Sequence, residues 1–177
     1  MAFHRTQISF LIGLFLLPYS GCTQIEKENN TNGKIIKAAK EMMQDTNTCA
    51  LITIDIEGRP RVRTMDPFPP EKDFTVWFGT NIHSRKVGQI KKNNRVTLYY
   101  LDKDATGYVT IHGTAEIVND SSSKEKYWKE AWKNFYPVYP EGYALIKVTP
   151  LWMEVISETR GILGDDKTWQ PQKITFN

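Results

Sequence analysis

Short apolar stretches with strand-like alternation dominate the chain after residue 34. The expected strands cover residues 50–56, 61–65, 74–79, 95–101, 107–118, 143–148 and 152–156. They are rich in β-branched and aromatic residues and are separated by glycine and proline turns. Three helices are expected, at 34–43, at 84–92, and from Ser121–Ser123 to Pro137. Six or seven short strands with few helices predict a mainly β protein, a small β-barrel with short helices. Within the longest strand, Gly113 lies where a barrel strand could bend.

The first 22 residues predict an export signal rather than part of the fold. An apolar run of about ten residues, 8–17, follows a basic start and is too short to span a bilayer. Small residues then precede Cys22, which indicates a bacterial lipoprotein cleavage site with Cys22 as the lipidated first residue. An ordinary cleaved signal peptide is the alternative. Residues 23–33 are polar and without apolar periodicity, so we expect a flexible tether before a domain at 34–177, in an exported, membrane-anchored protein of the bacterial envelope.

The composition excludes several classes of site. The net charge of +3 is small and its basic residues are dispersed, which argues against a nucleic-acid-binding protein. If Cys22 is lipidated, Cys49 is the remaining thiol, so neither an internal disulfide nor a cysteine zinc site can form. The sequence contains no metal-hydrolase or serine-hydrolase motif. Cys49 is expected to be a small buried residue, and no metal site is expected.

The most informative pattern is a basic helix start. The run Ser84-Arg85-Lys86 follows an expected strand and begins an expected helix, so it places a hydroxyl and two cations where unpaired N–H groups already favour an anion. On a neighbouring strand, Arg63 could contact the same anion from a second direction. Two simpler interpretations stay open: a basic first turn after a Ser cap, and a solvated hairpin face carrying Arg61 and Arg63.

The same region resembles a known family. The motifs that carry this resemblance, in order, are Arg63-Thr64-Met65, Phe78-Gly79-Thr80-Asn81, Ser84-Arg85-Lys86, Gln89-Ile90, Asn93-Asn94-Arg95-Val96-Thr97-Leu98 and Gly113-Thr114-Ala115-Glu116. In order and spacing they are similar to the pyridoxamine 5'-phosphate oxidase-like family of FMN-binding split barrels, and the shorter general-stress-protein branch is the most similar. The resemblance extends over residues 34–155.

The resemblance implies FMN as the cofactor, a small-molecule redox substrate, and a homodimer with the flavin between its subunits. The cofactor-binding residues that it implies are Arg63, Thr64, Met65, Gly79, Thr80, Ser84, Arg85 and Lys86. Arg63 and the Ser84–Lys86 triplet would contact the phosphate and ribityl chain, and the others would lie along or beside the flavin ring. The position of Gln89 faces the site in the family, although a solvent-facing glutamine is an equal alternative.

Departures from the family pattern concern the substrate. Tyr108 takes the position of a cofactor-binding glutamine of the true oxidases. In the region where those enzymes grip the substrate phosphate, this chain has a single arginine, Arg160, and no histidine. We therefore expect an FMN-dependent oxidoreductase of unknown substrate and no true pyridoxamine-phosphate oxidase activity. The alternative is a non-catalytic module that binds or carries haem, deazaflavin or flavin, although His83 and His112 match no haem motif.

Overall fold

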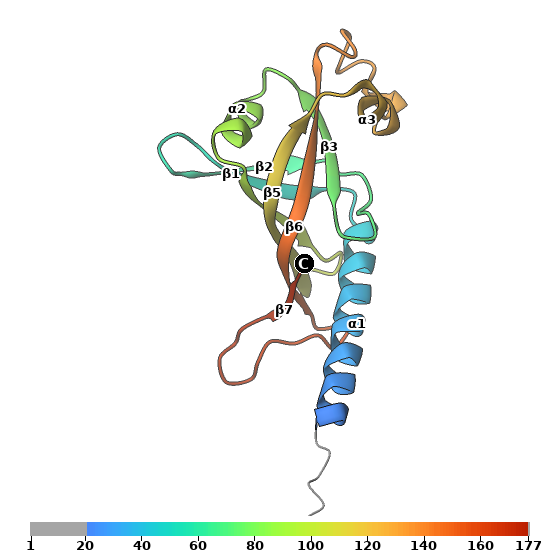
Figure 1. The fold of residues 1–177 in the computed structure, drawn as a ribbon, viewed down its shortest axis with the longest axis vertical. Coiled ribbons are helices and arrows are strands. Elements are labelled where there is room, and N and C mark those ends of the chain that lie inside the picture. The colour runs from blue at the N-terminus through green and yellow to red at the C-terminus, as the bar shows by residue number, and fades with distance from the viewer. Residues whose placement is uncertain (1–20, 177) are drawn as a thin grey trace, which may run out of the picture.

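The computed structural model describes residues 21–176, with side chains from residue 30 onward. Its elements, in chain order, are α1 (Gly21–Asp45), β1 (Cys49–Ile54), β2 (Pro60–Met65), β3 (Val76–Asn81), α2 (Arg85–Lys92), β4 (Arg95–Leu101), β5 (Gly107–Val118), α3 (Ser121–Lys126), a 3₁₀ turn η1 (Glu130–Trp132), β6 (Tyr143–Ser157) and β7 (Gln172–Thr175). The expected mainly β architecture is confirmed. The end of β3, α2 and α3 lie at one end of the molecule, and the N-terminal end of α1 projects from the other (Figure 1).

All seven described strands form one antiparallel, strongly twisted sheet. Its order is β2-β1-β4-β5-β6-β3, and β7 adds to β6. Pairing of β5 with β6 is the longest in the sheet and shifts register between His112 and Gly113. A Cβ atom at Gly113 would lie 2.2 Å from the carbonyl oxygen of Thr149, so only glycine allows the two backbones to approach there. The register shift thus lies at Gly113, the position where the sequence predicts a bend.

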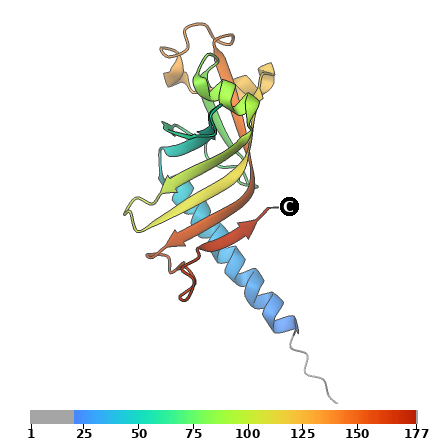
Figure 2. The same ribbon diagram turned by 90° about the vertical axis from the view of Figure 1, so that its left-hand side faces the viewer.

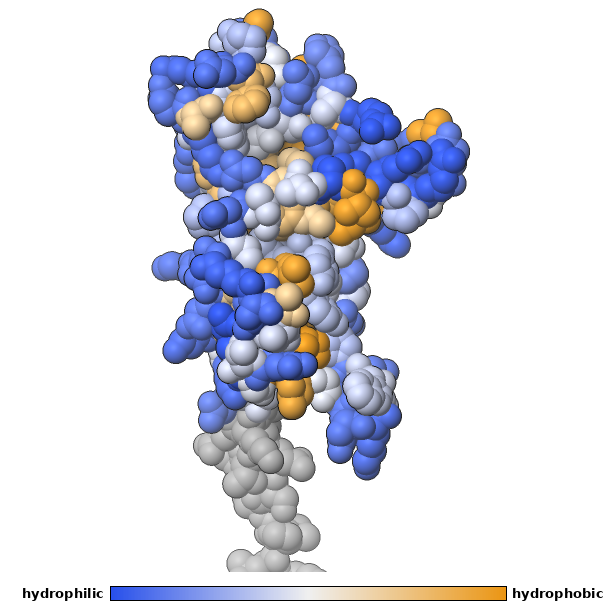
Figure 3. Space-filling view, turned by 180° about the vertical axis from the view of Figure 1, so that it is seen from behind, coloured by the Kyte–Doolittle hydropathy of each residue, from blue (hydrophilic) through white to orange (hydrophobic). Residues whose placement is uncertain are grey.

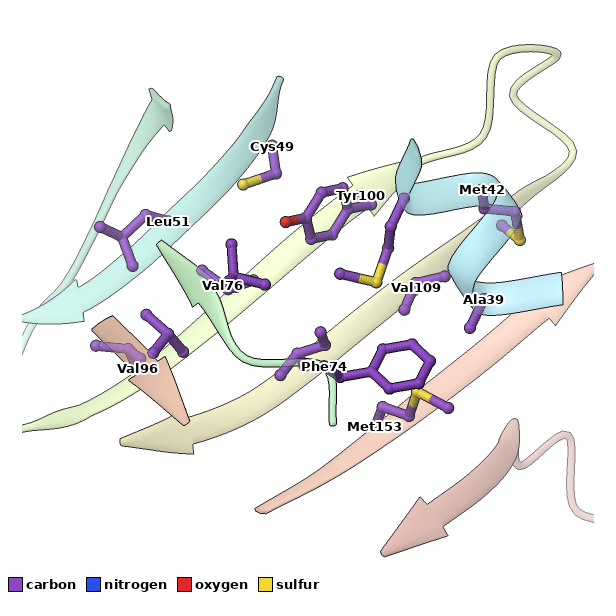
Figure 4. Close-up of a cluster of buried hydrophobic side chains, with 14 of the residues drawn as sticks. Ala39, Met42, Cys49, Leu51, Phe74, Val76, Val96, Tyr100, Val109 and Met153 are labelled. Atoms are coloured by element: carbon purple, nitrogen blue, oxygen red, sulfur yellow. The ribbon is translucent and has the colours of Figure 1, made fainter. Parts of the chain in front are cut away.

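Helix α1 covers one face of the sheet and completes the core. It passes behind the strands in Figure 2. The side chains of Ala39 and Met42 belong to the same buried cluster as Met153 of β6 and Phe74, which lies just before β3 (Figure 4). As expected, Cys49 is buried in this cluster, and burial raises the pKa of its thiol to about 12. Because the thiolate is the reactive form, Cys49 is an inert packing residue.

Helix α1 begins earlier than the sequence pattern indicates. The predicted flexible tether at residues 23–33 is wrong in this structure, because these residues are helical as part of α1. The segment contains no proline, and four of its eleven residues are Glu, Lys or Gln, which are good helix formers. It can therefore extend a helix that packing of its second half stabilises. Of the predicted signal at residues 1–22, residues 1–20 lie outside the described residues, as does the side chain of Cys22. Within residues 21–176, no helix is long and apolar enough to cross a membrane.

The two strands expected at 143–148 and 152–156 are one continuous strand, β6. Thr149 and Pro150 pair with Thr114 and Gly113, so the ladder continues through the position where the pattern indicates a break. Pro150 is tolerated because it lies at the register shift.

The helix expected from residue 121 to Pro137 is also wrong, because α3 ends at Lys126. The carboxylate of Asp120, rather than the serines, caps it by accepting a hydrogen bond from the backbone N–H of Ser123 at 2.8 Å. The aromatic residues that follow pack individually against several neighbours, and only the short turn η1 is helical among them.

An ion pair holds the far end of the sheet. Arg160 donates from Nη1 to the Asp102 carboxylate at 2.6 Å, and the side chain of Asp102 is only 4% exposed. The Ser157 hydroxyl donates to the same carboxylate at 3.4 Å. The arginine that the sequence offers for substrate binding is therefore already paired with a buried carboxylate.

We predict that Arg160→Ala destabilises the fold by about 3 kcal/mol, because it leaves the buried Asp102 charge without its cation. Urea denaturation followed by circular dichroism measures this. The control is Lys133→Ala, which breaks an exposed pair with Glu130 and should cost less than about 1 kcal/mol. Equal effects of the two substitutions would contradict the assignment.

Candidate functional site

The turn between β3 and α2 directs polar side chains toward one another. Ser84 has extended backbone angles at the N-cap position of α2, yet its side chain does not cap the helix. Its hydroxyl lies 3.3 Å from that of Thr80, which is buried near the end of β3. Lys86, in the first turn of α2, donates from Nζ to the same Thr80 hydroxyl at 2.9 Å. Three residues of the predicted site are thus in contact.

Arg63 reaches the region from β2. Its Nη1 donates to the Thr53 hydroxyl at 2.7 Å, and its Nη2 donates to the side-chain oxygen of Gln89 at 3.0 Å. The Thr53 hydroxyl in turn donates to Gln89 at 2.6 Å. The structure therefore decides between the two interpretations of Gln89: its amide faces inward and orients the arginine.

These cations are close enough to disfavour one another's charge. Burial, followed by the charges of Arg85 and Arg61, lowers the pKa of Arg63. Burial, followed by the charge of Arg63, lowers the pKa of Lys86. Among the described residues, neither they nor Arg85 form an ion pair with a carboxylate, whereas Arg61 pairs with Asp55 at 2.8 Å. A partly buried cation cluster without a carboxylate favours an anionic ligand.

A hollow of about 300 Å³ adjoins this cluster. It is lined by Thr64, Met65, Asp66, Gly79, Thr80, Lys86, Trp132, Phe135 and Tyr136. Five of the eight predicted cofactor residues are in this set. Of the other three, Ser84 contacts Thr80. The charge of Arg85 lowers the pKa of Arg63, and the charge of Arg63 lowers the pKa of Lys86, so these three cations are also close together. The structure thus brings all eight predicted residues together in one region of the folded protein.

Three aromatic residues of the hollow are absent from the sequence-based prediction. Trp132, Phe135 and Tyr136 belong to the connection between β5 and β6, which folds back toward β3. A signal is present in the sequence, since seven of the residues from 127 to 143 are aromatic. That density is typical both of a core and of a ligand site, so the pattern alone does not distinguish them.

Gly79 allows this aromatic connection to lie against β3. A Cβ atom at Gly79 would lie 2.3 Å from the Trp132 ring and 2.6 Å from the ring of Tyr143, which is fully buried. Because Gly79 has no side chain, the Trp132 ring can pack directly against the backbone of β3.

The remaining candidate residues lie elsewhere. Tyr108 stacks on Tyr99 with ring centroids 5.6 Å apart. His112 stacks on Trp152 at 3.7 Å and contributes to a different hollow on the sheet. His83 is exposed in the turn before α2. Over residues 21–176, no group of His, Cys, Asp and Glu side chains could hold a metal ion.

We predict that Gly79→Ala destabilises the protein by about 1–3 kcal/mol, because the new methyl group overlaps Trp132 and Tyr143. Gly88→Ala is the matched control, since a Cβ atom there meets nothing within 4 Å. Gly88 lies inside α2, so alanine should stabilise by about 0.5–1 kcal/mol. Thermal and urea unfolding of both variants measure the two changes in the free energy of unfolding. A Gly79→Ala protein as stable as wild type would refute the contact with Trp132.

Solved structures share this architecture. General stress protein 26 from Bacillus anthracis is 24% identical and superposes with a TM-score of 0.63, covering 80% of this chain and 98% of its own. A related protein from Clostridium acetobutylicum, also 24% identical, has a TM-score of 0.65 and covers 81% and 94%. A pyridoxamine 5'-phosphate oxidase-related, FMN-binding protein from Nostoc punctiforme is 15% identical, with a TM-score of 0.58 and coverage of 80% and 95%. The expected fold, a mainly β FMN-binding split-barrel type, is confirmed.

Sequence comparison agrees with the fold. A pyridoxine/pyridoxamine 5'-phosphate oxidase from Crocosphaera subtropica is 32% identical over 108 residues, which are 58% of this chain. The chain spans only half the length of that relative. Residues 34–156 match the family described as pyridoxamine 5'-phosphate oxidase like. The chain therefore belongs to the pyridoxamine 5'-phosphate oxidase-like family.

Proposed function

We propose that this chain is an FMN-binding redox protein that acts on a small-molecule substrate. The observation that carries the proposal is the cation cluster of Arg63, Arg85 and Lys86, which has no described carboxylate partner and adjoins a hollow. A phosphate monoester carries close to two negative charges at neutral pH and would compensate this cluster.

The phosphate end of the site would use side chains and backbone together. Arg63 can offer guanidinium N–H donors that Thr53 and Gln89 do not use, and Lys86 adds a second cation held by Thr80. The N-terminus of α2 has no acidic residue in its first turn, so its free N–H groups and dipole also favour an anion. The Ser84 hydroxyl does not cap α2, and when it accepts its hydrogen bond from Thr80, its own hydrogen can be donated to a ligand oxygen.

The ring end would use the wall of the hollow. Thr64 and Met65 come from β2, and Gly79 and Thr80 come from β3. These residues give the hollow one flat, mainly uncharged side next to the cations. A bound flavin would supply the exchange of electrons with a substrate, and these residues would hold and orient its ring.

We also propose a homodimer, because apolar side chains are exposed on the face of the sheet turned away from α1. One cross-strand row of this face consists of Val62, Ile52, Thr97, His112 and Trp152. Val62 is 65% exposed and Leu101, on the same face, is 50% exposed. Exposed apolar area on this scale is typical of a face that another protein chain covers.

Oxidation of pyridoxamine 5'-phosphate is not part of the proposal. Such an oxidase must hold a substrate phosphate in addition to that of the cofactor, and the positioning contributes much of the rate. Arg160, which the sequence offers for this role, is paired with Asp102 instead. We therefore propose a substrate without a phosphate group, in contrast to the named activity of the Crocosphaera relative.

We predict that Arg63→Ala and Lys86→Ala each weaken FMN binding about ten- to a hundredfold, since each removes a charge-assisted contact worth about 1.5–3 kcal/mol. Quenching of flavin fluorescence on titration measures the affinity, and an absorption spectrum distinguishes flavin from haem. The control is Lys92→Ala, which removes the same charge from the other end of α2 and should change the affinity less than threefold. Unchanged binding in both test variants would remove the phosphate site.

Localisation at the bacterial envelope through a lipid on Cys22 is part of the same proposal. Its support is the sequence pattern before Cys22, in a region outside the described side chains. We predict that metabolic labelling with a fatty-acid analogue marks the wild-type protein and not Cys22→Ser. Unlabelled, soluble wild-type protein would instead indicate an ordinary cleaved signal peptide.

A further inference from the structure

The connection between β5 and β6, residues 119–142, builds a wall of the hollow that the cofactor residues do not provide. It lies at the same end of the molecule as α2 (Figure 1). Its aromatic residues Trp132, Phe135 and Tyr136 face the hollow. The side chain of Phe135 is 73% exposed, and exposing an aromatic ring to water costs free energy that contact with a ligand would recover.

This wall is held in place by neighbouring rings. The Trp132 ring packs edge to face on Phe68, with centroids 5.6 Å apart, and on Trp128 at 6.1 Å. Tyr136 packs on Trp132 at 6.0 Å and on Tyr143 at 5.2 Å. Edge-to-face packing from several directions fixes the plane of Trp132, so the hollow has a preformed flat side.

The aromatic end of the hollow offers no free charge. The two charged residues that line the hollow are Lys86 and Asp66. Lys86 belongs to the proposed phosphate end, and Asp66 pairs with Lys129 at 2.5 Å. Lys129 also donates to the carbonyl oxygen of Pro67 at 3.1 Å and lies 5.2 Å from the centre of the Trp132 ring. Its charge is therefore already compensated within the protein.

We propose that Trp132, Phe135 and Tyr136 form a substrate subsite for a flat, uncharged, conjugated ring, and that the substrate class is the quinones. The proposal rests on the proposed FMN function for its redox role, whereas ring binding itself depends on the aromatic wall alone. In this subsite a quinone would take two electrons and two protons from reduced FMN, which leaves the hydroquinone and oxidised FMN. An external hydride donor must then reduce the FMN again before the next turnover.

The choice of an uncharged ring follows from the wall's electrostatics. The faces of aromatic rings carry partial negative charge, so they repel an anion that has been stripped of water. A cation would be attracted by the rings but repelled by Lys86 and Arg63 close by. A neutral ring avoids both penalties and gains stacking and burial against the aromatic wall of the hollow.

The test measures equilibrium binding of menadione, an uncharged naphthoquinone, by calorimetry in the presence of saturating FMN. We expect Trp132→Ala to weaken menadione binding about tenfold, by loss of stacking and burial. Trp132→Phe keeps a ring and should stay within about threefold of wild type, which separates ring contact from collapse of the connection. Trp169→Ala removes a tryptophan that is 87% exposed on the loop before β7, and it should leave binding unchanged.

Two further measurements make the outcome decisive. A naphthoquinone sulfonate of similar size should bind the FMN-saturated wild type at least about tenfold more weakly than menadione, because it adds an anion to the same ring. FMN affinity is measured separately on every sample, so loss of FMN binding would count against the proposed function, and menadione binding without FMN would still test the subsite. The subsite is refuted if wild type does not bind menadione, if Trp132→Ala binds it equally well, or if the sulfonate binds as tightly.

Discussion

The close backbone contact between β5 and β6 is the constraint on which the rest of the structure depends. It requires glycine at two places, since a Cβ atom at Gly107 would lie 2.3 Å from the carbonyl oxygen of Ile156 and one at Gly113 would meet Thr149. Both ends of the molecule are fixed to this pair. The first half of β6 pairs with β3 and so places Gly79, while its second half pairs with β7 and leads to the Arg160–Asp102 ion pair.

The candidate site keeps its positive charge because its cations are held by neutral groups. Thr53 and Gln89 accept hydrogen bonds from Arg63, and Thr80 accepts one from Lys86. Such partners orient the cations without cancelling their charge, whereas a carboxylate in the same place would compete with any anionic ligand. The lowered pKa values of Arg63 and Lys86 show that this arrangement disfavours their charged forms when no ligand is bound. Sites that bind ligands commonly accept a loss of stability of this kind.

Most of the fold could be predicted from local pattern, because strand alternation is visible in the sequence. The observed bounds of β4 and β5 are those expected from it, and α2 begins one residue later than expected. Prediction failed where tertiary packing decides. Pro150 indicates a strand break, yet a register shift absorbs it, and the aromatic residues after Lys126 pack on several partners instead of along one helix. The contact between Gly79 and Trp132 joins residues far apart in the chain, so no local pattern could show it.

The length of α1 outside the core sets the distance between the chain's N-terminal end and the domain. From behind, hydrophobic groups reach the surface as separate patches among hydrophilic ones (Figure 3). The first buried described side chain of α1 is Ile35, so the helix extends from Gly21 for about 20 Å before it meets the core, at about 1.5 Å per residue. With Cys22 anchored as proposed, this projecting part of α1 is a rigid helical spacer rather than a flexible linker. The domain would stand at a set height above the lipid headgroups with its hollow at the distal end (Figure 1). Such a protein would take water-soluble quinones from the aqueous phase, and a quinone dissolved within the bilayer would be out of its reach.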